Sequence, residues 1–278
     1  MEKRKPYLVC CICKNESKYI EEFVEYHLEL GFDKIIIGDN NDLDGEKYDD
    51  QLKDYIDYDE VEIINLRGLV AQQIPFYNHI IKNYDYEWCA FIDCDEFITF
   101  AKNSKYNNIK DFLESRDYVF AYGLNWQVYG DNNRVYAGEG GVLDRFKIPM
   151  PSDFKFHYPF PENYHIKSII KLSGDEFVFD KNSHNVNFNG YFSPNGEKFL
   201  ETSPFSPKMD FSVLYIRHFY TKSLEEWVNK KMKNKFADFK PSDSISYYPI
   251  EDYFIYNKVT DAKIKYLKQH GIEYKKKL

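Results

Sequence analysis

The segment Trp88-Cys89-Ala90-Phe91-Ile92-Asp93-Cys94-Asp95-Glu96-Phe97 is an apolar run of strand length that ends in three acids within four positions. In a parallel sheet, the crevice beyond the carboxyl end of a strand is the usual place for a ligand. Carboxylates two positions apart on an extended segment project to the same side, so Asp93 and Asp95 could share one divalent cation that holds a diphosphate. The alternative is a solvated acidic turn after a buried strand.

Apolar runs alternate with helical patterns in the chain before this segment. The pattern predicts strands at residues 7–13, 34–38 and 61–65 and helices at residues 20–30, 48–56 and 71–84. Such alternation indicates right-handed crossovers and a mainly parallel sheet with helices on both faces. Asn15, Asp39 and Asp93 would then lie at one edge of the sheet. No glycine-rich phosphate loop follows any of these strands, so a nucleotide at this edge would need a metal.

The composition restricts the partners. The net charge of −8 over 278 residues disfavours nucleic acid as a partner. The five cysteines are odd in number, lie in apolar runs and lack the paired spacing of metal sites, which predicts buried thiols in a reducing compartment. No apolar run approaches the roughly 18 residues that span a bilayer, and the charged start is unlike a signal peptide. We therefore expect a cytoplasmic location.

Several short motifs occur in an order that resembles a known enzyme family. They are Lys14-Asn15-Glu16, the helical segment at 23–32, the turn at 39–45, the acidic segment at 91–97, Asn125-Trp126, and the segments at 143–146, 167–170, 184–185 and 218–223. From about residue 7 to residue 228 the chain resembles the bacterial glycosyltransferases grouped with family 2 and family 92. It departs from the family pattern at Asp131-Asn132-Asn133, on the acceptor side.

The resemblance implies a GT-A-like (Rossmann-like) α/β fold, in which helices flank a mainly parallel sheet. We expect a catalytic domain at 1–222, with a nucleotide-binding half at 1–100 and an acceptor half at 101–222, and a C-terminal helical extension at 223–278. The implied activity is metal-dependent transfer of a sugar, with inversion, from a UDP-sugar to a glycan or lipid-linked oligosaccharide. Such an enzyme would be a hexosyltransferase of surface polysaccharide synthesis.

The resemblance also assigns roles at the strand ends. Asn15, Glu16 and Asp39 would contact the base and ribose, Asp93 the ribose or the metal, and Asp95 the metal. A departing nucleoside diphosphate gains negative charge, and Mn²⁺ or Mg²⁺ stabilises that charge without proton transfer. Structural alternatives remain, because Asn15-Glu16 could be a helix-capping turn and Asp39 an Asx turn. We interpret the neighbouring Glu96 as a structural acid that starts the next segment.

Residues later in the chain offer a third metal ligand and a positive charge. Neutral imidazole can complete the coordination of Mn²⁺ beside carboxylates, and in the resembling family a histidine in the position of His218 often does so. His218 is therefore favoured over His184, although a lone histidine is more often a hydrogen-bonded core or surface residue. Lys167 is favoured over Arg145 and Lys171 for neutralising the diphosphate, although lone basic residues are usually solvated or paired.

Inverting transfer needs a general base that takes the proton of the acceptor hydroxyl. The run at 141–146 is strand-like and sets Asp144 among apolar neighbours, which makes Asp144 the candidate. Alternatively, Asp144 pairs with Arg145 or Lys147 at the surface. Three other residues compete for the role of base: Glu139, Glu162 and His165.

Basic residues gather towards the C-terminus of this acidic chain. A helix begins at 224–228 and continues as a basic face to Lys235, and a final helix at 261–270 precedes Tyr274-Lys275-Lys276-Lys277. One interpretation is peripheral contact with an anionic membrane that carries a lipid-linked acceptor. The other is a solvated helix face and tail.

Two other functions remain open. A nucleotidyltransferase would use similar paired acids on a similar sheet and would release diphosphate from a nucleoside triphosphate. A sugar-nucleotide-binding protein without catalysis would bind a donor and turn over no acceptor.

Overall fold

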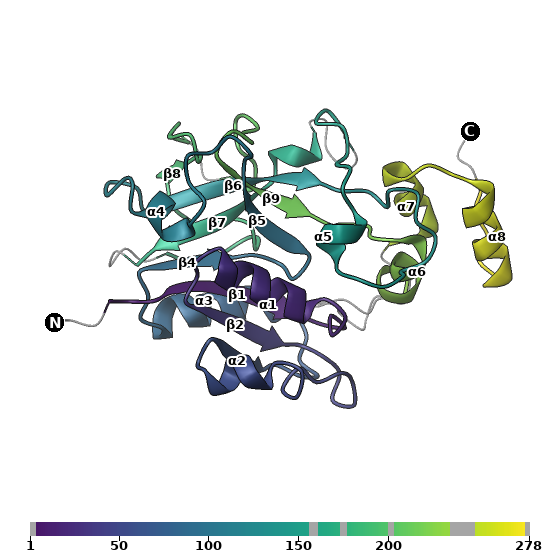
Figure 1. The fold of residues 1–278 in the computed structure, drawn as a ribbon, viewed down its shortest axis with the longest axis horizontal. Helices are drawn as coiled ribbons and strands as arrows, with labels where there is room; N and C mark the ends of the chain where they lie inside the picture. The colour runs from purple at the N-terminus through teal and green to yellow at the C-terminus, as the bar shows by residue number, and fades with distance from the viewer. Residues whose placement is uncertain (1–3, 156–160, 173–176, 200–202, 234–247, 276–278) are drawn as a thin grey trace.

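The computed structural model describes residues 4–155, 161–172, 177–199, 203–233 and 248–275 (Figure 1). Within these residues, nine strands form one sheet in the order β3-β2-β1-β4-β7-β6-β9-β5, with β8 paired to β6. The strands are β1 (Tyr7–Cys13), β2 (Lys34–Asp39), β3 (Val61–Asn65), β4 (Trp88–Phe91), β5 (Glu96–Phe100), β6 (Ala121–Val128), β7 (Ile166–Lys171), β8 (Tyr191–Phe192) and β9 (Leu214–His218). The helices are α1 (Ile20–Glu29), α2 (Lys53–Asp57), α3 (Gln73–Asn83), α4 (Ile109–Leu113), α5 (Val142–Arg145), η1 (Glu162–Tyr164), α6 (Leu224–Glu226), η2 (Trp227–Lys231), α7 (Ile250–Tyr256) and α8 (Asp261–Gln269).

The first four strands of the sheet are parallel. Strand β1 pairs with β2 on one side and β4 on the other, so that Val9 lies between Ile35 and Ala90. Strand β3 adds to β2 in the same direction. The carboxyl ends of all four strands therefore meet at one edge, as the alternating pattern predicted.

Strand β1 is apolar throughout because both of its faces are covered. Val9 and Cys11 pack into the core on the side of α1, together with Phe23, whereas Cys10 packs on the side of α3 with Phe76. A strand buried on both faces has no reason to alternate between polar and apolar residues. All five cysteines are buried and none is disulfide-bonded.

The second half of the sheet is mixed. Strand β4 pairs antiparallel with β7, β7 pairs antiparallel with β6, and β6 pairs parallel with β9. After β4 the chain turns and crosses to the far edge, where β5 pairs antiparallel with β9. The turn that carries Asp93 and Asp95 therefore lies between the carboxyl end of β4 and the start of β5. The predicted α/β class, with a mainly parallel sheet flanked by helices, is confirmed.

Two local predictions were wrong. The predicted strand at 141–146 is the short helix α5, because the Glu22 carboxylate on α1 accepts hydrogen bonds from the backbone N–H groups of Val142 (2.7 Å) and Leu143 (3.1 Å). The predicted helix at 48–56 forms only over α2 (Lys53–Asp57).

The C-terminal helices pack together at one end of the molecule (Figure 1). Their core contains Trp227 and Tyr253. Asp131 joins this unit to the preceding loop, because it forms a buried ion pair with Lys263 and accepts a hydrogen bond from the Tyr253 hydroxyl. The departure from the family pattern at Asp131 thus has a structural role. Among the helices of the described residues, none combines the length and apolar character that crossing a bilayer requires.

Part of the predicted basic C-terminal surface, at 234–235 and 276–277, lies outside the described residues. The domain limits and the membrane contact stay predictions.

Candidate active site

The acidic turn after β4 separates its three carboxylates. Asp93 Oδ2 lies 2.8 Å from the Lys167 ammonium, and Asp93 Oδ1 accepts a hydrogen bond from the Gln73 amide (2.6 Å). The Asp93 side chain is 33% exposed, whereas Glu96 is fully buried and its Oε2 accepts a hydrogen bond from the backbone N–H of Asp93 (3.0 Å). Burial raises the pKa of Glu96 well above its usual value, and Lys167 opposes this shift. Glu96 therefore shapes the turn, while Asp93 is partly exposed to solvent.

Asp95 points away from that group, towards the end of β9. Its Oδ1 lies 3.6 Å from His218 Nε2, and its Oδ2 lies 3.8 Å from the Lys222 ammonium. Burial alone would raise the pKa of Asp95, but the positive charges of Lys222 and its neighbours outweigh burial and lower it. The carboxylate is therefore ionised. Its backbone carbonyl accepts a hydrogen bond from Phe219 N (2.9 Å), which holds the turn against the end of β9.

His218 is a neutral imidazole. It is buried, and burial lowers its pKa to about 4, although Asp95 opposes the shift. Its Nδ1 has no hydrogen-bond partner among the described residues. A neutral imidazole beside an ionised carboxylate is a donor set that suits Mn²⁺.

The pair formed by Asp95 and His218 fits a divalent cation. Two ligand atoms that are each about 2.1 Å from one ion lie at most about 4.2 Å apart, so the separation of 3.6 Å between them is compatible with a shared ion. Across the ranges that the structure describes, no three His, Cys, Asp or Glu side chains converge as a ready metal site. Further ligands would therefore come from water or a substrate, as is usual for Mg²⁺ at phosphate sites.

Asn15 and Asp39 meet through Asn41 at the ends of β1 and β2. Asn41 Oδ1 accepts a hydrogen bond from the backbone N–H of Asn15 (2.8 Å), and Asn41 Nδ2 donates to Asp39 Oδ1 (2.7 Å). Asp39 also forms a buried ion pair of 2.8 Å with Arg67. The two predicted strand-end residues are thus brought together. Their partners Asn41 and Arg67 were missed, because they follow the strands without a distinctive spacing.

Glu16 connects this edge to the region around Asp95. Its Oε2 lies 3.7 Å from the Lys222 ammonium, and its Oε1 forms an ion pair with Lys230. Lys222, Lys230 and Lys231 line a cavity of about 310 Å³, and Asn15 and Tyr19 also contribute to its wall. The sequence patterns assigned no role to Lys222 and placed Lys230 and Lys231 only on a basic helix face.

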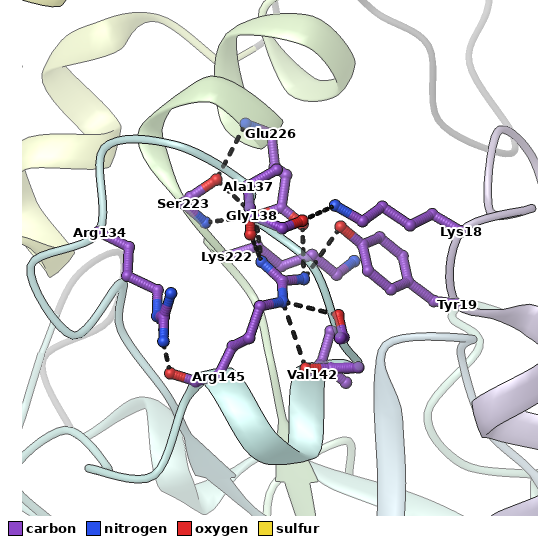
Figure 2. A network of polar contacts seen from close by, with 12 residues as sticks. Lys18, Tyr19, Arg134, Ala137, Gly138, Val142, Arg145, Lys222, Ser223 and Glu226 are labelled. Atoms are coloured by element: carbon purple, nitrogen blue, oxygen red, sulfur yellow. Dashed lines mark hydrogen bonds and ion pairs between the residues drawn. The ribbon is translucent and has the colours of Figure 1, made fainter.

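Arg145 and Asp144 do not lie where the sequence patterns placed them. Arg145 is buried in a network with Glu226, Tyr19 and the carbonyls of the 137–141 loop (Figure 2), so its charge is already neutralised. Asp144 lies on the first turn of α5 with its side chain 84% exposed, and it pairs with Lys147 at 3.3 Å. The alternative interpretation, in which Asp144 pairs with Lys147 at the surface, is therefore the one observed. Residues 142–145 form helix α5 and not the strand that would have placed Asp144 among apolar neighbours.

Several histidines surround the indole of Trp126. His165 stacks on it with ring centroids 4.6 Å apart, and the centroids of His184 and His218 lie at 5.1 and 4.3 Å. His165 Nδ1 also lies 3.5 Å from the Glu162 carboxylate. Of the competing candidates for the base, Glu162 and His165 are buried in this cluster, while Glu139 lies on the surface.

Lys167 is 1% exposed and paired with Asp93, while its Nζ lies 3.8 Å from Glu96 Oε2. Lys171, its competitor for the diphosphate, pairs with Glu87 at 3.4 Å. Both lysines therefore have carboxylate partners within the protein.

Comparison with known proteins identifies related sequences. The model of glycosyltransferase family 92 matches residues 5–253. A glycosyltransferase family 92 protein of Oryza sativa subsp. japonica is 26% identical over 164 residues, which is 59% of this chain and 26% of the relative. This chain therefore aligns with only about a quarter of that relative.

Solved structures with weak similarity include two of S. aureus TarS. The first is 14% identical, with 85% of this chain and 41% of that chain covered and a TM-score of 0.42. The second, residues 1–349 in complex with UDP-GlcNAc, is 14% identical, with 79% and 60% covered and a TM-score of 0.40.

Proposed function

Because the chain belongs to glycosyltransferase family 92, we propose that it transfers a sugar from a nucleoside diphosphate sugar to a hydroxyl of a glycan or lipid-linked oligosaccharide. The observation that carries this proposal is the pairing of ionised Asp95 with neutral His218 beside the carboxyl edge of the parallel strands. A cation held there would face the region where α/β sheets bind nucleotides. A UDP-sugar is the donor to test first.

The donor would lie along the edge formed by the ends of β1, β2 and β4. We assign the base and ribose to the surface around Asn15 and Asp39, and a ribose or sugar hydroxyl to Asp93. Lys167 is buried behind Asp93 and bonded to its carboxylate. It therefore orients Asp93 and does not contact the diphosphate, which revises the role expected from the sequence.

Asp95 and His218 would hold the metal. When bound, Mn²⁺ or Mg²⁺ supplies electrostatic stabilisation of the charge that develops on the departing diphosphate. Asp95 contributes a carboxylate that stays ionised, and His218 contributes an imidazole that stays neutral, because burial has lowered its pKa to about 4. The nearby lysines Lys222 and Lys230 add positive charge at the same end of the site.

We assign the role of general base to His184 in place of Asp144. His184 Nδ1 lies 3.0 Å from the Ile166 carbonyl, so Nδ1 carries the proton and Nε2 is the unprotonated nitrogen. Burial lowers the pKa of His184 well below its usual value, which keeps the ring neutral. The ring of His184 packs against Trp126, and His218 contacts the same indole. Attack from the face opposite the leaving group would invert the anomeric carbon.

Substitution of His184 tests this assignment. His184→Gln should lower kcat about 10²-fold or more, the usual contribution of a general base, while the affinity for the donor stays unchanged. An unchanged kcat would remove His184 from the mechanism.

A thermal-shift screen of UDP- and GDP-sugars with and without Mn²⁺ tests the proposed activity as a whole. We expect one donor to raise the Tm in the presence of Mn²⁺ and to have little effect without it. The stabilising donor is then incubated with candidate acceptors. Release of a nucleoside diphosphate supports sugar transfer, whereas binding without turnover of any acceptor would favour a non-catalytic sugar-nucleotide-binding protein. Stabilisation by nucleoside triphosphates with release of diphosphate would favour a nucleotidyltransferase.

A further inference from the structure

Lys222 places a positive charge between two buried carboxylates of the site. Its ammonium lies 3.8 Å from Asp95 Oδ2 and 3.7 Å from Glu16 Oε2, and Lys222 itself is buried. Glu16 Oε2 has no hydrogen-bond partner within the described part of the chain. The ammonium therefore lies between the two carboxylates, while Lys230 pairs with the other oxygen of Glu16.

The surroundings of Lys222 fix this position. Its backbone has φ +52°, a left-handed conformation that residues other than glycine rarely adopt. Directly after it, Ser223 begins α6 in a capping box with Glu226. The Lys222 ammonium lies 4.9 Å from the centre of the Tyr19 ring, whose hydroxyl accepts a hydrogen bond from Arg145 (Figure 2). Non-glycine residues in such a conformation cluster at functional sites.

The same lysine lines the cavity of about 310 Å³ beside Asn15. Lys230 and Lys231 line it from η2, which is a π-helical turn. Turns of this kind are rare and are frequently found at functional sites. Lys18 also lines the cavity, together with the carboxylates of Glu46, Glu225 and Glu226. A diphosphate in this cavity would meet these four ammonium groups, and Lys222 could turn towards it from Asp95.

A divalent cation and the Lys222 ammonium compete for the same carboxylate. A cation on Asp95 and His218 would have a positive charge only a few ångströms away, and at such distances repulsion between like charges is strong. A diphosphate relieves the conflict, because it gives the ammonium a new partner and supplies further oxygen ligands to the metal.

We propose that Lys222 couples the binding of the metal to the binding of the nucleoside diphosphate, a proposal that rests on the proposed glycosyltransferase function. In the absence of a diphosphate, the Lys222 ammonium stays beside the Asp95 carboxylate. When a diphosphate binds in the cavity, the Lys222 ammonium moves away from Asp95 to contact it. The metal alone therefore binds weakly, and metal and diphosphate strengthen each other's binding by the same factor. Lys222 is a positioning residue in this scheme.

Direct measurement of Mn²⁺ binding tests the coupling without any need for turnover. Free Mn²⁺ is followed by electron paramagnetic resonance in titrations of the wild-type protein, with and without saturating UDP, and with GDP as a second probe. The variants are Lys222→Met and Lys222→Asn, since asparagine tolerates a left-handed backbone. Lys147→Met is the matched control, because Lys147 is an exposed lysine that pairs with Asp144 on the surface. Thermal melting verifies that each variant is folded.

For the wild type, UDP or GDP should raise the affinity for Mn²⁺ at least about tenfold, within the usual range of coupling between two sites. Both Lys222 variants should bind Mn²⁺ alone at least about tenfold more tightly than the wild type, because a like charge has been removed. The enhancement by nucleotide should shrink correspondingly. The Lys147→Met control should match the wild type.

Two negative results have different meanings. If Mn²⁺ binding is lost in Asp95→Asn but is unchanged in the folded Lys222 variants, the coupling is overturned and the proposed function stands. If Asp95→Asn binds Mn²⁺ as the wild type does, Asp95 is not a metal ligand, and both the proposed metal site and the coupling fail.

Discussion

Arg145 and Glu226 form a buried ion pair with two parallel hydrogen bonds, each 3.0 Å long (Figure 2). The same guanidinium donates to the carbonyls of Ala137 and Gly140 and to the Tyr19 hydroxyl. It thereby joins the 137–141 loop, the start of α1 and α6. Because Tyr19 lies next to Lys222, this ion pair supports one wall of the candidate site.

We predict that Arg145→Met lowers the free energy of unfolding by about 3–5 kcal/mol, the usual cost of leaving one partner of a buried ion pair alone. Arg145→Lys should cost less, because it keeps the charge but loses the planar fork. Urea unfolding followed by circular dichroism measures both values. The exposed Lys147→Met is the control. A loss of unfolding free energy below about 0.5 kcal/mol for Arg145→Met is typical of a surface substitution and would contradict the prediction.

Lys167 and Glu96 offer a second test of a buried charge. Lys167→Met should destabilise the protein by about 3–5 kcal/mol, because it leaves the buried Glu96 beside Asp93 without a cation. Glu96→Gln combined with Lys167→Met should cost less than the sum of the two single changes, since the residues interact. A double-mutant cycle in urea measures the difference. Strict additivity would show that the lysine does not stabilise Glu96.

His27 makes stability depend on pH. Its Nδ1 lies 2.8 Å from the Phe23 carbonyl, its Nε2 accepts a hydrogen bond from Ile98 N (3.3 Å), and burial lowers its pKa to about 4. The unfolded chain, with an ordinary histidine pKa near 6.5, therefore binds more protons than the folded chain between these values. The resulting stability is fully present above about pH 6.5 and is lost as the pH falls towards 4.

The measurement compares the wild type with His27→Phe, which cannot titrate at this position. Between pH 7.5 and pH 5.0, the wild type should lose about 2 kcal/mol of unfolding free energy relative to the variant. Urea unfolding at the two pH values gives this difference. A constant difference would mean that His27 is protonated equally in the folded and unfolded chain.

Asp144→Asn should leave transfer activity within about twofold of the wild type, because an exposed side chain in a surface ion pair contributes little. Steady-state kinetics with the donor found by the thermal-shift screen measures the effect. A loss of about 10²-fold, as expected for a general base, would restore Asp144 to the mechanism and remove His184.

Local patterns were sufficient to predict the first half of the sheet. The apolar runs of β1 and β2 and the helical spacing of α1 depend on nearest neighbours along the chain, and Gly31 ends the helical segment with φ +109°. The edge that holds Asn15, Asp39 and Asp93 followed from the parallel connections alone.

Contacts between distant segments could not be predicted in the same way. Helix α5 forms because Glu22 caps it from 120 residues away, so the local run at 141–146 was misleading. Lys222 and Lys230 reach Glu16 through a left-handed residue and a π-helical turn, neither of which has a sequence signature. The sequence patterns assigned no role to Arg67, because its partner Asp39 lies far back in the chain at the end of β2.

The central claim is that Asp95 is the metal ligand of a nucleotide-sugar transferase, and the most direct test measures nucleoside diphosphate release by Asp95→Asn with Mn²⁺ and the donor and acceptor identified for the wild type. Asp117→Asn, which alters an exposed aspartate, is the matched control. We predict that Asp95→Asn melts cooperatively near the wild-type Tm but loses metal-dependent release, whereas the control retains it. Full release by Asp95→Asn, or by the wild type in excess chelator, would contradict the account.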